Sequence, residues 1–397
     1  MASICIYFQV HQPVRLKRLS IYDQNLPKDL LDRYFDLNLN RDVFNKVADK
    51  CYLPANNLLL ELVKKYEGKF KISYSLTGTF LEQAAQYRPE VLDSFQALAK
   101  TGSVDFLNET YYHSLCSLFE NKSEFVDQVR MHSKELKERF GMDADVFRNT
   151  EALFSNEIAR LVEELGYKGI ISEGHEGLLG WRSPNYLYSV KGCHEIKALL
   201  RNYKLSDDVS YRFSARWWPE WPLTADKYAN WLAESPGQCI NLFMDYETFG
   251  EHQWKETGIF EFLRHFPEEV FKHKNLDFKT PDEMIREAKP VGEIDAPRPI
   301  SWADIERDTS AWLGNDMQRE CFRILQSLEG PVRETRDENL LHVWRLLQNS
   351  DHLYYLCTKS WADGDVHKYF SPFDSPYEGF INFMNILQDF KKEVEHA

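Results

Sequence analysis

Short apolar segments rich in β-forming residues alternate with helical patterns through the first two thirds of this chain. The candidate strands cover residues 4–10, 71–76, 104–107, 146–149, 169–172, 198–203 and 239–244. The helical patterns between them cover residues 53–66, 89–100, 123–140, 156–165 and 225–233. A strand–helix–strand unit repeated about seven times favours parallel pairing with right-handed crossovers. The sequence therefore predicts an α/β fold built on a parallel barrel that is closed or nearly closed.

The pattern changes near residue 280. Helical patterns cover residues 316–328, 337–350 and 377–394, without a convincing strand among them, and a proline-rich stretch at 290–299 precedes them. We therefore predict two domains, a catalytic barrel in residues 1–280 and a helical region in residues 281–397 that contributes to the active-site cleft.

Charge and cysteine content narrow the possible partners. The chain has 62 acidic and 48 basic residues, a net charge of −14, which opposes nonspecific binding to nucleic acid or to an anionic membrane. No run of about 18 apolar residues is present to span a membrane, and residues 2–10 are typical of a first strand rather than of a signal peptide. Seven scattered cysteines without a CxxC pair indicate reduced thiols in a cytoplasmic chain. No motif indicates an oligomeric state.

The residues that follow the predicted strands are the candidates for chemistry, because loops converge at the carboxyl ends of the strands in a parallel barrel. These residues are rich in carboxylates: His11 and Gln12, Asn108 and Glu109, Glu151, Glu173 and His175, and Asp245 with Glu247. Serine or cysteine nucleophiles with partners are scarce among them. This composition favours carboxylate chemistry over a catalytic triad.

Glu151 and Asp245 are the two strongest candidates. Glu151 ends a strand and precedes a helix, where Arg148 and Asn149 could hold it ionised; the alternative is a capping or surface glutamate. Asp245 follows the apolar run 240–244, which is typical of a strand buried on both faces. Partial desolvation there raises the pKa of a carboxyl group toward the range useful for proton transfer.

The loop after Asp245 leaves two other interpretations open. Glu247 and His252 are predicted to bind substrate. As alternatives, they can be ordinary polar loop residues, or Asp245, His252 and His11 can be metal ligands. No HxxxH or HxH spacing supports a metal, so we predict none. A metal-dependent hydrolase such as a polysaccharide deacetylase stays the rival class.

Aromatic residues indicate a carbohydrate ligand. Trp217, Trp218 and Trp221 crowd one short segment with prolines and a glutamate, and flat rings beside carboxylates suit the apolar faces of a sugar. Two carboxylates together with these three tryptophans fit cleavage of a glycosidic bond, a reaction that needs no cofactor. A noncatalytic glucan-binding protein is the alternative that keeps only the tryptophans.

Five ordered blocks resemble the conserved regions of glycoside hydrolase family 57, most closely its α-amylase members. They are residues 11–13, 102–115, 147–157, 243–252 and 301–318. The resemblance implies a (β/α)7 barrel, a distorted TIM-like fold, followed by a helical region. It also implies a retaining attack on the α-glucosidic bonds of starch, glycogen or maltooligosaccharides. Transfer to another sugar, as in a 4-α-glucanotransferase or a branching enzyme, is the alternative within the family.

The same resemblance assigns roles to individual residues. Glu151 would be the nucleophile, Asp245 the general acid/base, and His11 would line the subsite where the sugar is cleaved. The last block would bring residues from the helical region to the cleft: Trp302, Asp304, Asp308, Trp312 and Asn315. Asp308 can equally be an acidic cap at a helix start. Asp105 stands where the family has glutamate, which affects substrate fit rather than chemistry.

Overall fold

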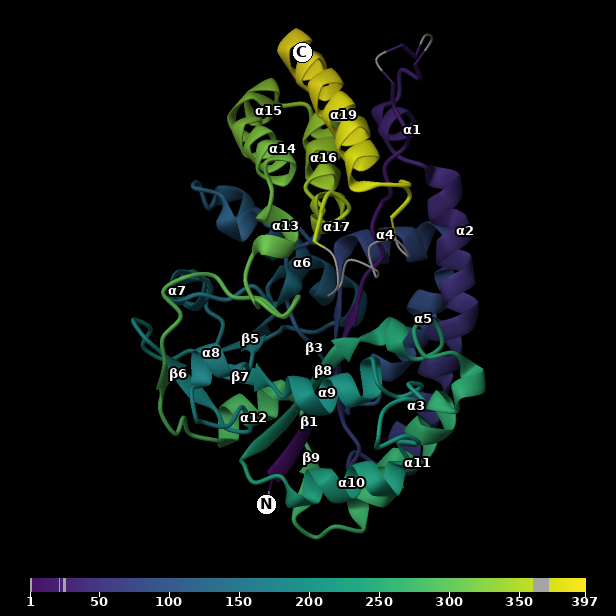
Figure 1. Cartoon of the computed structure of the whole chain (residues 1–397), viewed down its shortest axis with the longest axis vertical. Helices are drawn as coiled ribbons and strands as arrows, with labels where there is room; N and C mark the ends of the chain where they lie inside the picture. Colours follow the sequence, from purple (N-terminus) through teal and green to yellow (C-terminus); the bar gives the residue numbers. More distant parts are fainter. Residues whose placement is uncertain (1, 21, 24–25, 360–370) are drawn as a thin grey trace.

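The computed structural model describes residues 2–20, 22–23, 26–359 and 371–397. The strands gather in one part of the molecule, and the C-terminal helices form a separate layer at the end that carries the C-terminus (Figure 1). In the part of the chain that is described, no helix is both long and apolar enough to cross a membrane.

Seven parallel strands form a closed ring. They are β1 (Ala2–Val10), β2 (Ile72–Leu76), β3 (Val104–Phe106), β4 (Val146–Phe147), β5 (Gly169–Glu173), β7 (Lys197–Arg201) and β8 (Cys239–Asp245). Each strand except β3 pairs with the next in this order, and β8 pairs with β1. Asn108 joins β3 to β4, because its N–H donates to Val146 O (3.1 Å) and its carbonyl accepts from Arg148 N (2.8 Å). The ring confirms the predicted (β/α)7 barrel.

Three short strands were not predicted from the sequence. β6 (Tyr188–Val190) pairs antiparallel with β7, β10 (Glu293–Ile294) pairs parallel with β6, and β9 (Leu276–Phe278) pairs parallel with the start of β1. Each has only two or three residues, too few to show a hydrophobic period. They extend the sheet beyond the ring.

Helix α1 (Leu30–Tyr34) lies beside the C-terminal helices (Figure 1). The helices that surround the barrel are α2 (Leu37–Val47), α3 (Leu53–Lys65), α4 (Gly78–Tyr87), α5 (Pro89–Ala99), α6 (Ser123–Phe140), α7 (Asn156–Glu164), α8 (Glu176–Leu179), α9 (Tyr203–Ser210), α10 (Ala225–Glu234), α11 (Ile259–Phe271) and α12 (Pro281–Glu287). The five predicted barrel helices are confirmed as α3, α5, α6, α7 and α10, and Gly141 ends α6 in the left-handed conformation.

The alternation of side chains along β8 decides which residues face the barrel interior. Cys239 and Phe243 belong to a cluster inside the ring, whereas Ile240, Leu242 and Met244 pack against the outer helices. Because side chains of a strand alternate between its faces, Asp245 continues the inward series at the carboxyl end of the strand. The period of the strand therefore places a carboxylate at the barrel mouth.

The C-terminal helices pack against the barrel through a buried ionic network. They are α13 (Ser310–Leu313), α14 (Asp316–Ser327), α15 (Glu329–Thr335), α16 (Glu338–Leu347), α17 (Ser350–Tyr354) and α19 (Pro376–His396). Glu124 of α6 is fully buried and pairs with Arg345 (2.9 Å) and Arg333 (2.6 Å). Beyond residue 280, α12 still packs on β5 and β10 pairs with β6. The division at residue 280 stays a prediction.

Candidate active site

Glu151 lies just beyond β4 at the carboxyl ends of the strands and is held from three sides. Its Oε1 accepts hydrogen bonds from His113 Nε2 (3.3 Å) and Ser350 Oγ (3.2 Å), and its Oε2 accepts from Trp302 Nε1 (2.9 Å). Its backbone has φ +56° and ψ 28°, the left-handed conformation that is strained for a glutamate. Strain of this kind at a residue with three fixed partners indicates a functional position.

His113 connects Glu151 to a second buried carboxylate. Its Nδ1 lies 3.5 Å from Glu109 Oε2, and Glu109 also accepts hydrogen bonds from Gln9 and Ser75. Burial lowers the pKa of His113, but its hydrogen bonds to Glu109 and Glu151 outweigh burial and raise the pKa to about 9. His113 is therefore a cation at neutral pH, placed between two anions.

The pKa values of Glu151 and Asp245 are displaced in opposite directions. Burial raises the pKa of Glu151, but the hydrogen bond and charge of His113 and the charge of Arg148 overcome it, and the pKa falls below its ordinary value. Burial and then the negative charge of Glu151 raise the pKa of Asp245 to about 6. One carboxyl group is thus kept ionised while the other retains a proton in mildly acidic solution, the division of roles expected of a nucleophile and an acid.

His11 and Gln12, which follow β1, both lie beside this centre. The His11 ring stacks on His113 with centroids 3.9 Å apart, and its nitrogens lie 2.9 Å from Thr77 Oγ1 and 3.0 Å from Asp351 Oδ2. Burial and the charge of His113 lower the pKa of His11 to about 4, so the ring is neutral at neutral pH. Gln12 donates to the Tyr52 hydroxyl (3.0 Å) and is nearly inaccessible to solvent.

Glu247, which follows Asp245, is positioned by a helical distortion. Tyr52 closes a π-helical turn at 48–52 between α2 and α3 and donates to Glu247 Oε1 (2.5 Å). Gly250 packs on this turn with φ +113°, and a Cβ there would lie 1.9 Å from Lys50 O, so only glycine fits. Burial and the charge of Asp245 raise the pKa of Glu247 to about 8.

The predicted residues of the last block separate into different roles. Trp302 donates its indole N–H to Glu151, and its part in substrate binding stays a prediction. Asp304 is buried and pairs with Lys359 (3.0 Å), and Asp308 accepts from Ser310 N (2.8 Å) just before α13. The N-cap of α13 is Thr309, so Asp308 makes a turn contact just before the helix rather than capping it, and its part in the cleft stays a prediction.

Trp312 and Asn315 differ from the expectation. Trp312 is 1% exposed and packs in the core against Tyr354, which leaves no ring face for a sugar. Asn315 caps α14 by accepting from Gln318 N (2.9 Å), and its amide donates to Leu356 O (2.9 Å). Both residues support the helical layer, because core packing and helix capping use the same residue types as sugar binding.

Trp217, Trp218 and Trp221 lie between α9 and α10 on the flank of the barrel. Trp217 and Trp221 are 79% and 43% exposed, whereas Trp218 packs edge to face on Trp231 of α10, with centroids 6.0 Å apart. The C-terminal end of α10, opposite to the end that follows the tryptophans, lies beside the start of β1. Asn275 joins the two by donating to Ala233 O and accepting from Ala2 N. Among the described residues, no ring contact or hydrogen bond of these tryptophans reaches Glu151 or Asp245. Their part in binding stays a prediction.

Two further positions singled out from the sequence are His252 and Asp105. His252 is exposed in the loop after β8, next to the buried Glu251, which pairs with Lys46 (2.5 Å). Asp105 lies inside β3, where burial and the charge of Asp282 in α12 raise its pKa to about 7. Its place within the strand agrees with an effect on packing rather than on chemistry.

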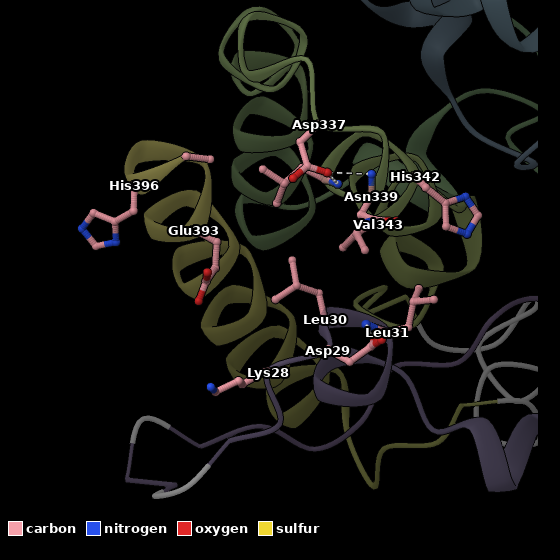
Figure 2. Close-up of a pocket in the computed structure, with 12 residues that line it drawn as sticks. Lys28, Asp29, Leu30, Leu31, Asp337, Asn339, His342, Val343, Glu393 and His396 are labelled. Atoms are coloured by element: carbon pink, nitrogen blue, oxygen red, sulfur yellow. Dashed lines mark hydrogen bonds between the residues drawn. The ribbon is translucent and has the colours of Figure 1, made fainter.

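No group of three or more His, Cys, Asp or Glu side chains within the described ranges is arranged to hold a metal ion. A cavity of about 390 Å³ lies elsewhere, between α1, the start of α16 and the end of α19 (Figure 2). None of the predicted site residues lines it.

Sequence reasoning missed His113, Ser350 and Asp351 as site residues. His113 lies four residues after Glu109 in one of the blocks that carry the resemblance, which was the available signal. Ser350 and Asp351 begin α17, about 200 residues beyond Glu151. Ser350 is the last residue of the predicted helix 337–350, and Asp351 lies just beyond it, in a stretch for which the sequence made no prediction. They show that the helical layer reaches the barrel mouth.

Comparisons with known proteins agree with these observations. The family model described as glycosyl hydrolase family 57 matches residues 5–297. A protein of Methanocaldococcus jannaschii named "Putative alpha-amylase" is 50% identical over 402 residues, which cover 99% of this chain and 85% of that protein. An alpha-amylase of Pyrococcus furiosus is 22% identical, over 64% of this chain but only 38% of its own length. The crystal structure of a GH57 branching enzyme from Thermococcus kodakaraensis superimposes with a TM-score of 0.71 at 12% identity, covering 98% of this chain and 90% of that one, and supports the fold.

Proposed function

Because this chain belongs to glycosyl hydrolase family 57, we propose that it cleaves α-glucosidic bonds of starch, glycogen or maltooligosaccharides with retention of configuration. One observation carries the proposal. Glu151 and Asp245 lie at the same end of the barrel, the charge of Glu151 raises the pKa of Asp245, and the pKa values of the two groups are displaced in opposite directions. A glycosidase requires two such carboxyl groups, one on each side of the sugar.

The mechanism that fits these groups is double displacement. Asp245 in its protonated form gives its proton to the interglycosidic oxygen while Glu151 attacks the anomeric carbon and forms a covalent glucosyl-enzyme. Asp245, now ionised, then removes a proton from water, which attacks the same carbon and releases the sugar. A retaining enzyme holds the two carboxyl groups about 5 to 5.5 Å apart.

The surrounding residues prepare these two steps. The His113 cation and the Trp302 indole N–H stabilise the Glu151 carboxylate and fix its orientation before substrate arrives. Asp245 lies in a desolvated position at the end of β8, which favours its neutral form. Neutral His11, fixed by Thr77 and Asp351, is placed to contact hydroxyl groups of the glucose unit that is cleaved.

Incubation of the purified protein with maltoheptaose tests the proposal. We expect products shorter than maltoheptaose whose newly formed reducing ends are in the α configuration when first released. Products longer than maltoheptaose would indicate transfer to another sugar, as in a glucanotransferase or a branching enzyme. Initial β products, or no cleavage of any α-glucan, would contradict the proposal.

A further inference from the structure

Two guanidinium groups lie over the indole ring of Trp302, the residue that contacts Glu151 twice. The Arg148 and Arg201 guanidinium carbons are 4.7 Å and 5.7 Å from the Trp302 ring centroid. The Trp302 indole N–H donates to Glu151 Oε2 (2.9 Å), and its backbone N–H donates to Glu151 O (3.3 Å). Both arginines belong to the barrel, at the ends of β4 and β7, whereas Trp302 comes from the segment that follows β10.

The same segment is attached to the barrel by charge. Arg307 donates to the Trp302 carbonyl and lies 3.3 Å from Glu173 Oε2, and the fully buried Glu173 also pairs with Arg201 (3.1 Å). Arg201 has a further ion pair with Asp207 (2.5 Å). Arg201 is therefore needed for several ion pairs besides its contact with Trp302.

Arg148 differs from Arg201 in having no such partners. It is fully buried, and none of its three guanidinium nitrogens forms a hydrogen bond with any residue that the structure describes. A buried charge without partners is destabilising. The face of the Trp302 ring is its identified direct contact, because a cation is attracted to the π face of an aromatic ring.

We propose that Arg148 is a positioning residue that holds the Trp302 ring so that the indole N–H fixes the Glu151 carboxylate for attack. The inference rests on the proposed nucleophilic role of Glu151. It assigns the arginine no contact with substrate. The charge of Arg148 also favours the ionised form of Glu151, which gives the arginine a second effect on the same group.

A double-mutant cycle tests this coupling. Arg148→Met removes the cation at similar volume, Trp302→Phe removes the indole N–H but keeps a ring, and the double variant combines them. Each single variant should lower kcat about 10- to 100-fold on maltoheptaose with little change in KM, as expected for loss of a hydrogen bond to a charged group. If the arginine acts largely through Trp302, the double variant should lose clearly less kcat than the product of the two single losses, because both changes remove the same hydrogen bond to Glu151. A loss of kcat in the double variant equal to the product of the two single losses would show that the residues act independently, and would overturn the proposal.

The substrate α-maltosyl fluoride shows which catalytic step Arg148 affects, because its fluoride leaves without a proton from an acid. The single variants should lose as much kcat with this substrate as with maltoheptaose. Recovery of the wild-type rate would show that Arg148 acts on the acid, Asp245, and would overturn the proposal. The acidic limb of the pH profile should move to higher pH in Arg148→Met, because the charge that favours ionised Glu151 is lost. In Arg148→Lys the limb should stay in place and part of kcat should be recovered, because a cation remains over the Trp302 ring. A full loss in Arg148→Lys, with an unmoved limb in Arg148→Met, would contradict the proposal.

Two matched controls separate positioning from general stability. Arg182→Met removes an arginine over Tyr188 (5.3 Å), and Trp344→Phe removes an indole N–H that donates to Leu325 O (2.9 Å), both away from Glu151. Both should leave kcat within about twofold of wild type. If Arg148→Met does not fold, the cycle is measured with Arg148→Lys and judged in the same way. Wild-type protein that cleaves neither substrate refutes the proposed function and this inference with it, whereas multiplying losses refute only the role of Arg148.

Discussion

The His113 imidazole donates a hydrogen bond to the Glu151 carboxylate across 3.3 Å, and Glu109 balances the charge on the other side of the ring. Removing this cation by His113→Asn should raise the pKa of Glu151. The ionised fraction of the nucleophile then falls in acid, so the acidic limb of kcat/KM should move to higher pH. We expect a loss of about 10- to 100-fold near pH 6, the value of a hydrogen bond to a charged group.

His342→Asn provides the control for that change. His342 lies 3.0 Å from the Tyr112 hydroxyl and is half-buried in the helical layer. Its pH profile should match that of wild type. An unchanged acidic limb in His113→Asn would show that His113 does not hold Glu151 ionised.

Asp245 should set the basic limb of the pH profile. An acid must be protonated to act, and its pKa of about 6 means that its active form declines as the pH rises through about 6. We therefore expect kcat/KM on maltoheptaose to fall above that pH. With α-maltosyl fluoride, whose leaving group needs no proton, the limb should disappear. A limb that persists unchanged with the fluoride would assign it to another group.

Removal of metal ions should leave cleavage of maltoheptaose unchanged. The ring nitrogens of His11 already face Thr77 and Asp351, and His252 lies in an exposed loop position. The measurement is kcat/KM before and after dialysis against EDTA. Loss of activity that zinc restores would favour the metal-dependent hydrolase over the carboxylate mechanism.

Trp217 and Trp221 should bind long glucan chains at the barrel flank rather than the bond that is cleaved. Alanine at both positions should raise KM for amylose roughly 2- to 10-fold, the value of one or two stacking contacts, and leave maltotriose cleavage unchanged. Trp181→Ala is the control, since Trp181 is 96% exposed in a different loop, after α8. An equal rise in KM for amylose in the control variant would refute a specific contact.

The barrel could be predicted from the sequence because short apolar runs alternate regularly with helical patterns, although β3 and β4 themselves have only three and two residues. In β8 the apolar run indicates the strand, and the alternation of side chains between its faces then aims the Asp245 carboxylate inward. The strand-end rule likewise located Glu151 and His11. These are local properties, which the order of residues along the chain determines directly.

The remainder of the site depends on contacts between distant segments. Ser350 reaches Glu151 and Asp351 reaches His11 only because α17 packs over the barrel mouth, and no local pattern records that packing. Trp312 was expected in the cleft, but a tryptophan in a short helix fits core packing equally well, and the structure places it in the core. Aromatic and capping residues in a motif therefore require coordinates before a role can be assigned to them.

Chemical rescue with azide tests the central claim that Glu151 attacks the anomeric carbon and Asp245 transfers the proton. Glu151→Ala and Asp245→Ala are incubated with α-maltosyl fluoride and azide, and the products are identified by NMR. In Glu151→Ala, azide should replace the missing nucleophile and give the β-glycosyl azide. In Asp245→Ala, azide should attack the covalent intermediate and give the α-glycosyl azide. The reverse pairing, or wild-type turnover in either variant without azide, would contradict the assignment.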